Sequence, residues 1–307
     1  MSTFTLTAQG PFALASSIAF LEGFTPASYD GAADRTLELA FPVEGDWQSV
    51  GVRVHEDPQG VTGEIVSPSA PGRELSEAVR AQVARILSLD VDGSGFPAVG
   101  ERDKVVAGLQ ARYPGLRPVC FHSPYEAAVW AVIGHRIRIK QAAAIKARMA
   151  KQLGEPVSFD GHVLHAFPSP HRLAELKSFP GLTGRKPEWL RAIAHAALDG
   201  RLDAEYLRGL APEQALAELK QLPGIGDFSA ELVLLRGVGA PDLTPRYGPW
   251  LARATALAYE LPGAPTTAEL AQLSENWSPY RTWVCLLLRV RLEDGAGEDK
   301  ERLRMDE

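Results

Sequence analysis

Residues 222–226, of sequence LPGIG, constrain the fold of this chain more than any other stretch. Before them, residues 212–220 carry leucines at helical spacing, and Gly224 is placed to end that helix. After them, residues 228–235 predict a second helix with an aliphatic face. The glycines let the backbone approach another molecule, and the second helix offers free N–H groups and its positive dipole end. This hairpin is typical of a phosphate-binding site, although a plain interhelical turn would use the same glycines.

The composition limits the class of protein but does not indicate what the protein binds. A chain of 307 residues with 45% hydrophobic and 23% charged residues is long enough for two domains with their own cores. Its net charge of −6 means that a nucleic acid would have to be held by a local basic face or by helix ends. Two cysteines are too few for a disulfide framework, and the sequence starts without the pattern of a signal peptide. We therefore expect a cytoplasmic protein that does not associate with membranes.

Residues 1–100 are predicted to form a small α+β layer. Short apolar runs with period-two alternation are separated by polar turns, which indicates an antiparallel sheet with one buried face. Residues 73–89 follow as an amphipathic helix. The expected strands are 4–8, 36–41, 50–54 and 61–66, with an earlier helix at 11–21.

Residues 101–307 are predicted to form an all-helical domain. Periods of 3.6 dominate there, and prolines and glycines mark the breaks. Ser123 and Pro124 form a strong helix start, because serine caps a helix and proline suits its first position. The expected helices are 124–134, 138–153, 186–198, 212–220, 228–237, 250–259, 267–273 and 279–292.

One run of basic residues stands out against the acidic chain, with no carboxylate among its charged side chains. This run can be a solvated helix face or a surface that contacts phosphates. Arg136 lies at a helix junction, where it would be free to probe a DNA groove. Lys186, in a Gly-Arg-Lys segment that opens another helix, could hold a further phosphate. The run contains His135, Arg136, Arg138, Lys140, Lys146, Arg148 and Lys151.

Several motifs spread along the chain resemble one family. They are YPGLR at 113–117, AVIG at 131–134, GRK at 184–186, LPGIG at 222–226 through Ala230, Arg236-Gly237 to Asp242, and WSPYRTW at 277–283, which matches W-x-P-[WY]-R-[ST]. With them the chain resembles the bacterial DNA-3-methyladenine glycosylase II family of the helix-hairpin-helix glycosylase superfamily. The resemblance implies an enzyme that flips a damaged nucleotide out of the duplex and hydrolyses its N-glycosidic bond. It also implies a monomer that needs no cofactor and whose partner is double-stranded DNA with a damaged base.

The resemblance assigns DNA contacts by position. Amides at the turn would bind a backbone phosphate together with the hydroxyl of Ser229, and a monovalent cation would lie at backbone carbonyls. The turn amides are those of Gly224, Ile225 and Gly226, and the carbonyls are those of Leu222 and Gly224. Arg136, Arg138 and Lys186 would complete the DNA-binding surface. Asp227 does not fit a phosphate site well, because its carboxylate stabilises a helix N-terminus but repels phosphate.

The base pocket is expected to be lined by Phe20, Phe228, His135, Trp250 and Arg289. Phe228 stands where the family often has tryptophan. Phe20 comes from the N-terminal layer, and for both phenylalanines the alternative is ordinary core packing.

The chain departs from the family around this pocket. The catalytic aspartate that the family places about a dozen residues after Arg236-Gly237 falls at Gly248, preceded by Tyr247. The family's wedge positions hold His135 and Arg136, and the C-terminal aromatic pair is replaced by Arg289 and Val290. The lysine of bifunctional relatives would fall at Phe228, so Schiff-base chemistry has no nucleophile.

The missing carboxylate leaves three hypotheses open. Tyr247, His135 or a water held by Asp242 would have to replace it, and its loss costs roughly 3 kcal/mol of transition-state stabilisation. An alkylated purine, which is already cationic and leaves as a neutral base, tolerates that loss best. The first hypothesis is therefore an alkylpurine glycosylase of reduced or altered activity. The alternatives are a non-catalytic paralogue that binds distorted duplex, and a protein that keeps only the fold.

Overall fold

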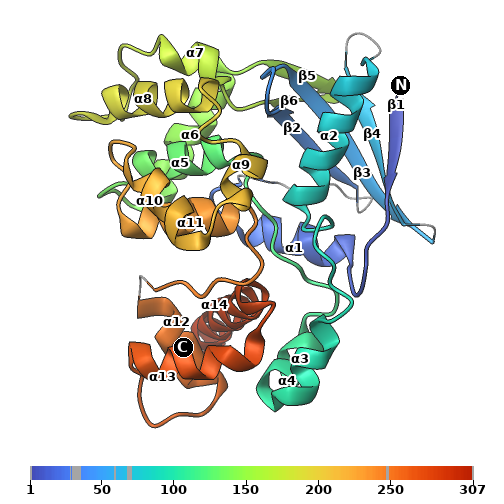
Figure 1. Ribbon diagram of the computed structural model, residues 1–307, viewed down its shortest axis with the longest axis vertical. Helices are drawn as coiled ribbons and strands as arrows, with labels where there is room; N and C mark the ends of the chain where they lie inside the picture. The colour runs from blue at the N-terminus through green and yellow to red at the C-terminus, as the bar shows by residue number, and fades with distance from the viewer. Residues whose placement is uncertain are drawn as a thin grey trace.

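The computed structural model describes residues 2–27, 29, 36–58, 60–67, 71–246 and 249–305. Its N-terminal part is the predicted antiparallel layer, a four-stranded sheet of order β1-β4-β3-β2 (Figure 1). The strands are β1 (Ser2–Leu6), β2 (Leu37–Pro42), β3 (Ser49–Asp57) and β4 (Gly60–Val66).

Alternating residues of the sheet build the first hydrophobic core. Val50, Val52 and Val54 of β3 are buried, and Val52 pairs with Ile65 of β4. Two helices share this core, α1 (Leu14–Gly23) and α2 (Arg73–Ile86). Burying the alternate side chains removes apolar surface from water and fixes the strand register.

The remaining chain is mostly helical, as predicted. Ser123 caps its first long helix by accepting the amide of Glu126 at 3.1 Å. The helices are α3 (Phe96–Arg102), α4 (Lys104–Arg112), α5 (Pro124–Ile133), α6 (Ile139–Leu153), α7 (Pro170–Ala174), α8 (Lys186–Leu198), α9 (Ala204–Gly209), α10 (Pro212–Lys220), α11 (Asp227–Arg236), α12 (Pro249–Ala258), α13 (Thr267–Ser274) and α14 (Arg281–Met305), with a 3-10 turn, η1 (Glu275–Trp277).

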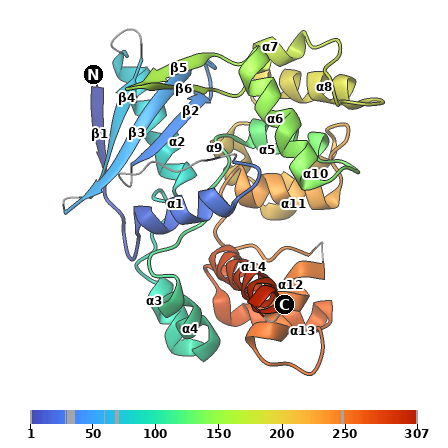
Figure 2. The ribbon, with the colours of Figure 1, turned by 180° about the vertical axis from the view of Figure 1, so that it is seen from behind.

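A short antiparallel hairpin interrupts the region that was expected to be entirely helical. It consists of β5 (Pro156–Phe159) and β6 (His162–His165), and it packs on the N-terminal sheet (Figure 2). Gly51 of β3 makes room for it, because a Cβ there would lie 2.5 Å from a methyl of Val157. The hairpin therefore joins the helical part to the sheet.

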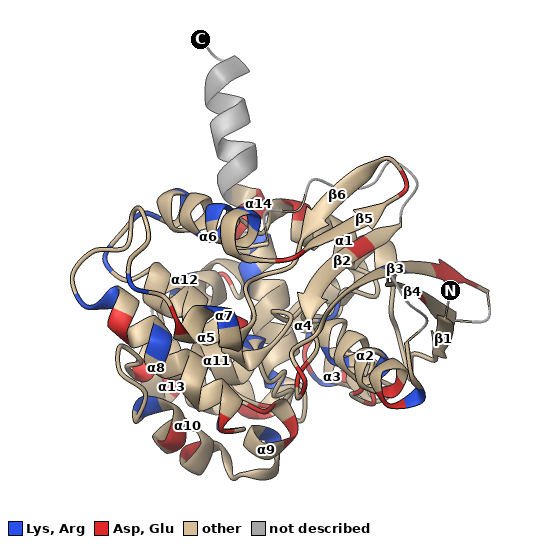
Figure 3. Cartoon of the chain, turned by 90° about the horizontal axis from the view of Figure 1, so that it is seen from above, with Lys and Arg blue, Asp and Glu red and all other residues tan. Residues whose placement is uncertain are grey.

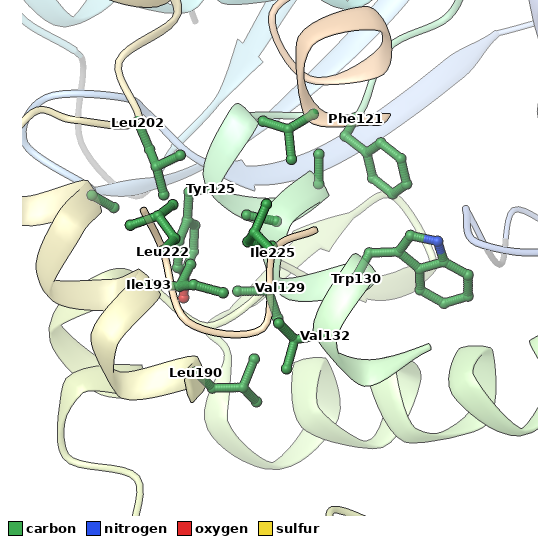
Figure 4. Packing of buried hydrophobic residues seen from close by; sticks show 14 of the residues in the cluster. Phe121, Tyr125, Val129, Trp130, Val132, Leu190, Ile193, Leu202, Leu222 and Ile225 are labelled. Atoms are coloured by element: carbon green, nitrogen blue, oxygen red, sulfur yellow. The ribbon is translucent and has the colours of Figure 1, made fainter. Parts of the chain in front are cut away.

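The helical part has two hydrophobic cores. One is formed by α5 to α11, where Figure 4 shows Leu222 and Ile225 directed toward Val129 of α5 and Ile193 of α8. The other joins α3 and α4 to α12, α13 and α14, which lie at the same end of the molecule (Figures 1 and 2), and it includes the buried Trp283. The turn between α10 and α11 is thus anchored in the first of these cores. The division of the chain at residue 100 stays a prediction.

Within the described part of the chain, no helix has both the length and the apolar character needed to cross a bilayer.

Candidate functional site

The turn between α10 and α11 has a geometry that requires a glycine at position 224. Gly224 has a φ of +83°, and a Cβ on it would lie 2.7 Å from the ring of Trp189. Ile225 is buried, and its amide donates to the carbonyl of Leu222 at 3.1 Å. Gly226 precedes α11, and nothing lies within 4 Å of a Cβ built on it. The core fixes one side of the turn, and the start of α11 is left open to a ligand.

The charge at the start of α11 is balanced within the hairpin. Asp227 is the first residue of α11, and its carboxylate lies 3.0 Å from the ammonium of Lys220 at the end of α10. This ion pair offsets the repulsion that Asp227 would exert on a phosphate. Ser229 lies two residues further on and is 5% exposed, and its contact with phosphate stays a prediction.

The loop between α5 and α6 carries the predicted wedge residues. His135 and Arg136 are exposed, and Arg136 has a φ of +55°, a conformation that is strained for any residue but glycine. The ring of His135 meets that of Trp189 edge-on, with centroids 6.1 Å apart. Trp189 therefore supports both this loop and the turn at Gly224. Arg138, exposed at the start of α6, follows directly.

The observed position of Lys186 contradicts the prediction that its ammonium faces a phosphate. The residue is 7% exposed, and its Nζ donates to the carbonyls of Ile133 and His135, both at 2.8 Å. Burial lowers the pKa of this ammonium. Lys186 thus caps the end of α5 and positions the wedge loop from below.

Part of the basic run also turns inward. Lys146 is nearly buried, lies 2.7 Å from the carboxylate of Glu126, and donates to the carbonyl of Pro26. The exposed positive face is therefore smaller than the sequence suggested, with basic residues remaining along α6 (Figure 3).

Two hollows meet at Phe228, which is 56% exposed. The first is an open groove between the wedge loop and the start of α11, which His135 and Arg136 line together with Phe228. The second is a cavity between α11, α12 and α14, about 610 Å³ including its open mouth. Its lining residues are Pro118, Phe228, Glu231, Leu232, Leu235, Arg236, Pro245, Trp250, Thr282, Cys285, Leu286 and Arg289.

The predicted pocket residues are brought together in part. Phe228, Trp250 and Arg289 line the same cavity, and Phe228 and Arg289 also line the groove that holds His135. Phe20 lines neither. It stacks on Phe24, a residue that lines the groove, with ring centroids 5.3 Å apart, and it also contacts a neighbouring arginine.

That neighbour is Arg236, whose buried guanidinium lies 5.1 Å from the ring of Phe20 and 4.6 Å from that of Phe24. It donates to the carbonyl of Val119 at 2.6 Å. Burial lowers its pKa to about 10, so it remains cationic at neutral pH. Arg289 is the second cation of the cavity, with its guanidinium 5.8 Å from the Trp250 ring.

Of the proposed substitutes for the missing aspartate, the described residues His135 and Asp242 do not line this cavity. Tyr247 and Gly248 lie outside the described residues. Asp242 is wrong as a candidate, because its carboxylate contacts Arg281 at 2.7 Å and Ser278 at 3.0 Å and lines neither hollow. It ties the chain after α11 to the start of α14.

Sequence reasoning missed Glu231, a carboxylate in the cavity wall. It lies on α11 one turn after Phe228 and is 3% exposed. Its Oε1 and Oε2 accept the amide N–H of Arg246 at 3.1 and 3.0 Å. Helical spacing held the signal, since residues 228, 231, 232 and 235 share one face of the helix.

No cluster of three or more His, Cys, Asp or Glu side chains is placed to hold a metal ion among the residues that the structure covers. The monovalent cation at the carbonyls of Leu222 and Gly224 stays a prediction.

The comparisons with known proteins agree on one kind of relative. No protein-family model matches the chain. The chain is 27% identical over 304 residues to DNA-3-methyladenine glycosylase 2 of Escherichia coli, covering 97% of this chain and 99% of the relative. It is 29% identical over 269 residues to a probable bifunctional transcriptional activator/DNA repair enzyme AlkA of Mycobacterium tuberculosis, covering 86% of this chain and 51% of that protein.

Among solved structures, the fold is similar to that of a 3-methyladenine DNA-glycosylase from Archaeoglobus fulgidus. The TM-score is 0.75 at 21% identity, and the alignment covers 94% of this chain and 97% of the other. The predicted fold class, an α+β layer followed by a helix-hairpin-helix glycosylase domain, is thereby confirmed.

Proposed function

Since this chain belongs to the DNA-3-methyladenine glycosylase II family, of the AlkA type, we propose that it binds damaged duplex DNA and releases alkylated purines. One observation carries the proposal. Phe228 follows the phosphate-binding turn by two residues and lines both the groove beside Arg136 and the cavity beside Trp250. A backbone phosphate held at the turn would therefore bring an extruded base to the mouth of the cavity.

The groove would supply the first part of this function, binding of the duplex DNA. The free N–H groups at the start of α11 would hold one phosphate, and Arg136 would enter the duplex where the base leaves. Lys186 fixes the loop that carries Arg136. Binding of this kind depends steeply on salt, because phosphate contacts release counterions.

The cavity would supply the second part of this function, cleavage of the bond between the base and the sugar. Phe228 and Trp250 offer flat apolar surface for a purine ring. When the C1′–N bond breaks, its electron pair leaves with the base, and water adds to C1′. A purine alkylated at N3 or N7 is cationic and departs as a neutral molecule, which lowers the demand on the protein. With Gly248 at the family's aspartate position, the proposed activity is reduced or altered.

The direct test is release of free base from methylated duplex DNA. With protein in excess over lesions, we expect 3-methyladenine or 7-methylguanine to appear in the supernatant faster than without protein. Release at the spontaneous rate would contradict the proposal that the protein catalyses base release. DNA of unmodified sequence is the control, and it should stay intact.

The second candidate, a non-catalytic protein that binds distorted duplex, is favoured by the hairpin together with Gly248 at the family's aspartate position. It predicts salt-sensitive binding to lesion-containing duplex without release of any base. In either case the proposed partner is double-stranded DNA with a damaged base, and we propose that the protein binds it in the cytoplasm as a monomer.

A further inference from the structure

Glu231 is the one acidic residue among the described residues that line the cavity between α11, α12 and α14. It lies one helical turn after Phe228, and the cavity is also lined by Trp250 and Arg289, which come from two other helices. Only 3% of its surface is exposed. A buried carboxylate on the wall of a cavity is costly unless hydrogen bonds or nearby cations compensate for the lost hydration.

The contacts of Glu231 fix its carboxylate in place. Both of its oxygens accept the amide N–H of Arg246, at 3.1 and 3.0 Å. Arg246 belongs to the segment that leads into α12, in which the family's catalytic aspartate position falls at Gly248. Glu231 therefore brings a carboxylate from α11 to the segment from which family members supply one.

The other charges of the cavity give this carboxylate an electrostatic task. Arg236 and Arg289 line the same cavity and are both cationic. The Nε of Arg289 donates to Glu293 at 2.9 Å, which partly balances that charge, while Arg236 donates to a backbone carbonyl. Without Glu231 the lining would repel a cationic base and the positive charge that develops on the sugar.

We infer that Glu231 is the carboxylate that faces the reacting sugar, in place of the family's aspartate. The inference rests on the proposed function. As the C1′–N bond breaks and its electron pair leaves with the base, the negative charge of Glu231 stabilises the cationic sugar. A water molecule then bonds to C1′, and the proton that it loses passes to the Glu231 carboxylate and on to solvent.

The test compares the wild type with Glu231→Gln and with Glu213→Gln as a matched control. Glu213 contacts the side chain of Arg246 at 3.5 Å but is exposed and lies outside the cavity lining. Two duplex probes are used, one with a neutral tetrahydrofuran abasic site and one with a cationic pyrrolidine in its place. The pyrrolidine mimics the charge of the sugar at the transition state, so the probe pair reports electrostatics without requiring turnover.

We expect the wild type and Glu213→Gln to bind the pyrrolidine duplex at least about tenfold more tightly than the tetrahydrofuran duplex. Glu231→Gln should lose that preference and keep the tetrahydrofuran affinity, and its release of 3-methyladenine should fall by about a hundredfold. A purely structural role would instead weaken both probes equally and lower the melting temperature.

The remaining outcomes separate the two proposals. A Glu231→Gln variant that keeps both the preference and the release rate overturns the assignment of Glu231, while the proposed function stands. A wild type that binds both probes equally also overturns the assignment. A wild type that binds neither duplex contradicts the proposed function, and the role of Glu231 falls with it.

Discussion

Replacing Gly224 with alanine tests how strongly the turn depends on its glycine. The φ of +83° is a left-handed conformation, which costs about 1–2 kcal/mol for a residue with a Cβ. The added Cβ would also lie 2.7 Å from a ring carbon of Trp189 and 3.2 Å from a methyl of Val132. Moving a packed ring in a core costs about 1–3 kcal/mol. The expected loss of stability is about 2–5 kcal/mol.

The magnitude converts into a measurable melting shift. An unfolding entropy of about 2.1 cal/mol/K per residue, over 307 residues, gives about 0.6 kcal/mol/K for the chain. The Gly224→Ala variant should therefore melt about 3–8 °C below the wild type in a calorimetric scan. It should also bind duplex DNA more weakly, because the displaced turn moves its amides.

The neighbouring Gly226→Ala variant is the matched control for stability. Gly226 has a φ of −100°, and nothing lies within 4 Å of a Cβ built on it. The change from glycine to alanine at an N-cap costs less than about 1 kcal/mol, or under about 2 °C. Equal melting temperatures for the two variants would refute the account of the turn, because neither the positive φ nor the Trp189 contact would then matter.

Three further predictions concern the wedge loop and the buried ion pair. Arg136→Gly and Arg136→Ala should both lower the salt slope of duplex binding by about one unit. Arg136→Ala should melt like the wild type, because both residues carry a Cβ at a φ of +55°, and Arg136→Gly should melt no lower, because that φ suits glycine. Lys186→Met should raise hydrogen exchange in the loop between α5 and α6 and cost about 1–3 kcal/mol, because two carbonyls lose a charged donor; unchanged exchange would refute this role. Burial alone would raise the pKa of Glu126, but Lys146 and His122 outweigh it and hold that pKa well below its usual 4.5, so the stability it contributes is present above about pH 4.5 and is lost as the pH falls. Acid titration of Glu126→Gln should show a weaker loss below that pH, and an identical profile would contradict the assignment.

Patterns of local origin were predicted well from the sequence. The alternation in β3 and the Ser123 cap of α5 identified their elements to within a few residues, because each depends on neighbouring side chains alone. The turn at Gly224 was also predicted, since a glycine that ends one helix just before another is a local signal.

The β5–β6 hairpin shows what local patterns miss. Its strands have four residues each, too few for a clear period, and its packing depends on a sheet more than a hundred residues earlier in the chain. The space that Gly51 leaves for Val157 is visible only when the two segments are brought together.

Charged residues of the site were predicted least well, because their direction depends on distant partners. The sequence suggested that Lys186 and Lys146 are surface cations. In the structure a backbone carbonyl of α5 accepts from the Lys186 ammonium, and the Glu126 carboxylate pairs with Lys146, so both side chains turn inward. Asp242 was expected to hold a water in place of the missing aspartate, but its carboxylate forms an ion pair with Arg281. Glu231 shares a helical face with Phe228, and its importance follows only from the cavity that α12 and α14 close around it.

The central claim, that this cavity removes an alkylated base, is tested most directly on a defined duplex with a single 7-methylguanine. Protein in excess is mixed with the end-labelled duplex, and abasic sites are revealed by alkaline strand scission over time. We expect a single-exponential rise in scission at the lesion alone, clearly faster than in the same duplex without protein. Scission at the spontaneous rate, on a duplex that the protein demonstrably binds, would contradict it.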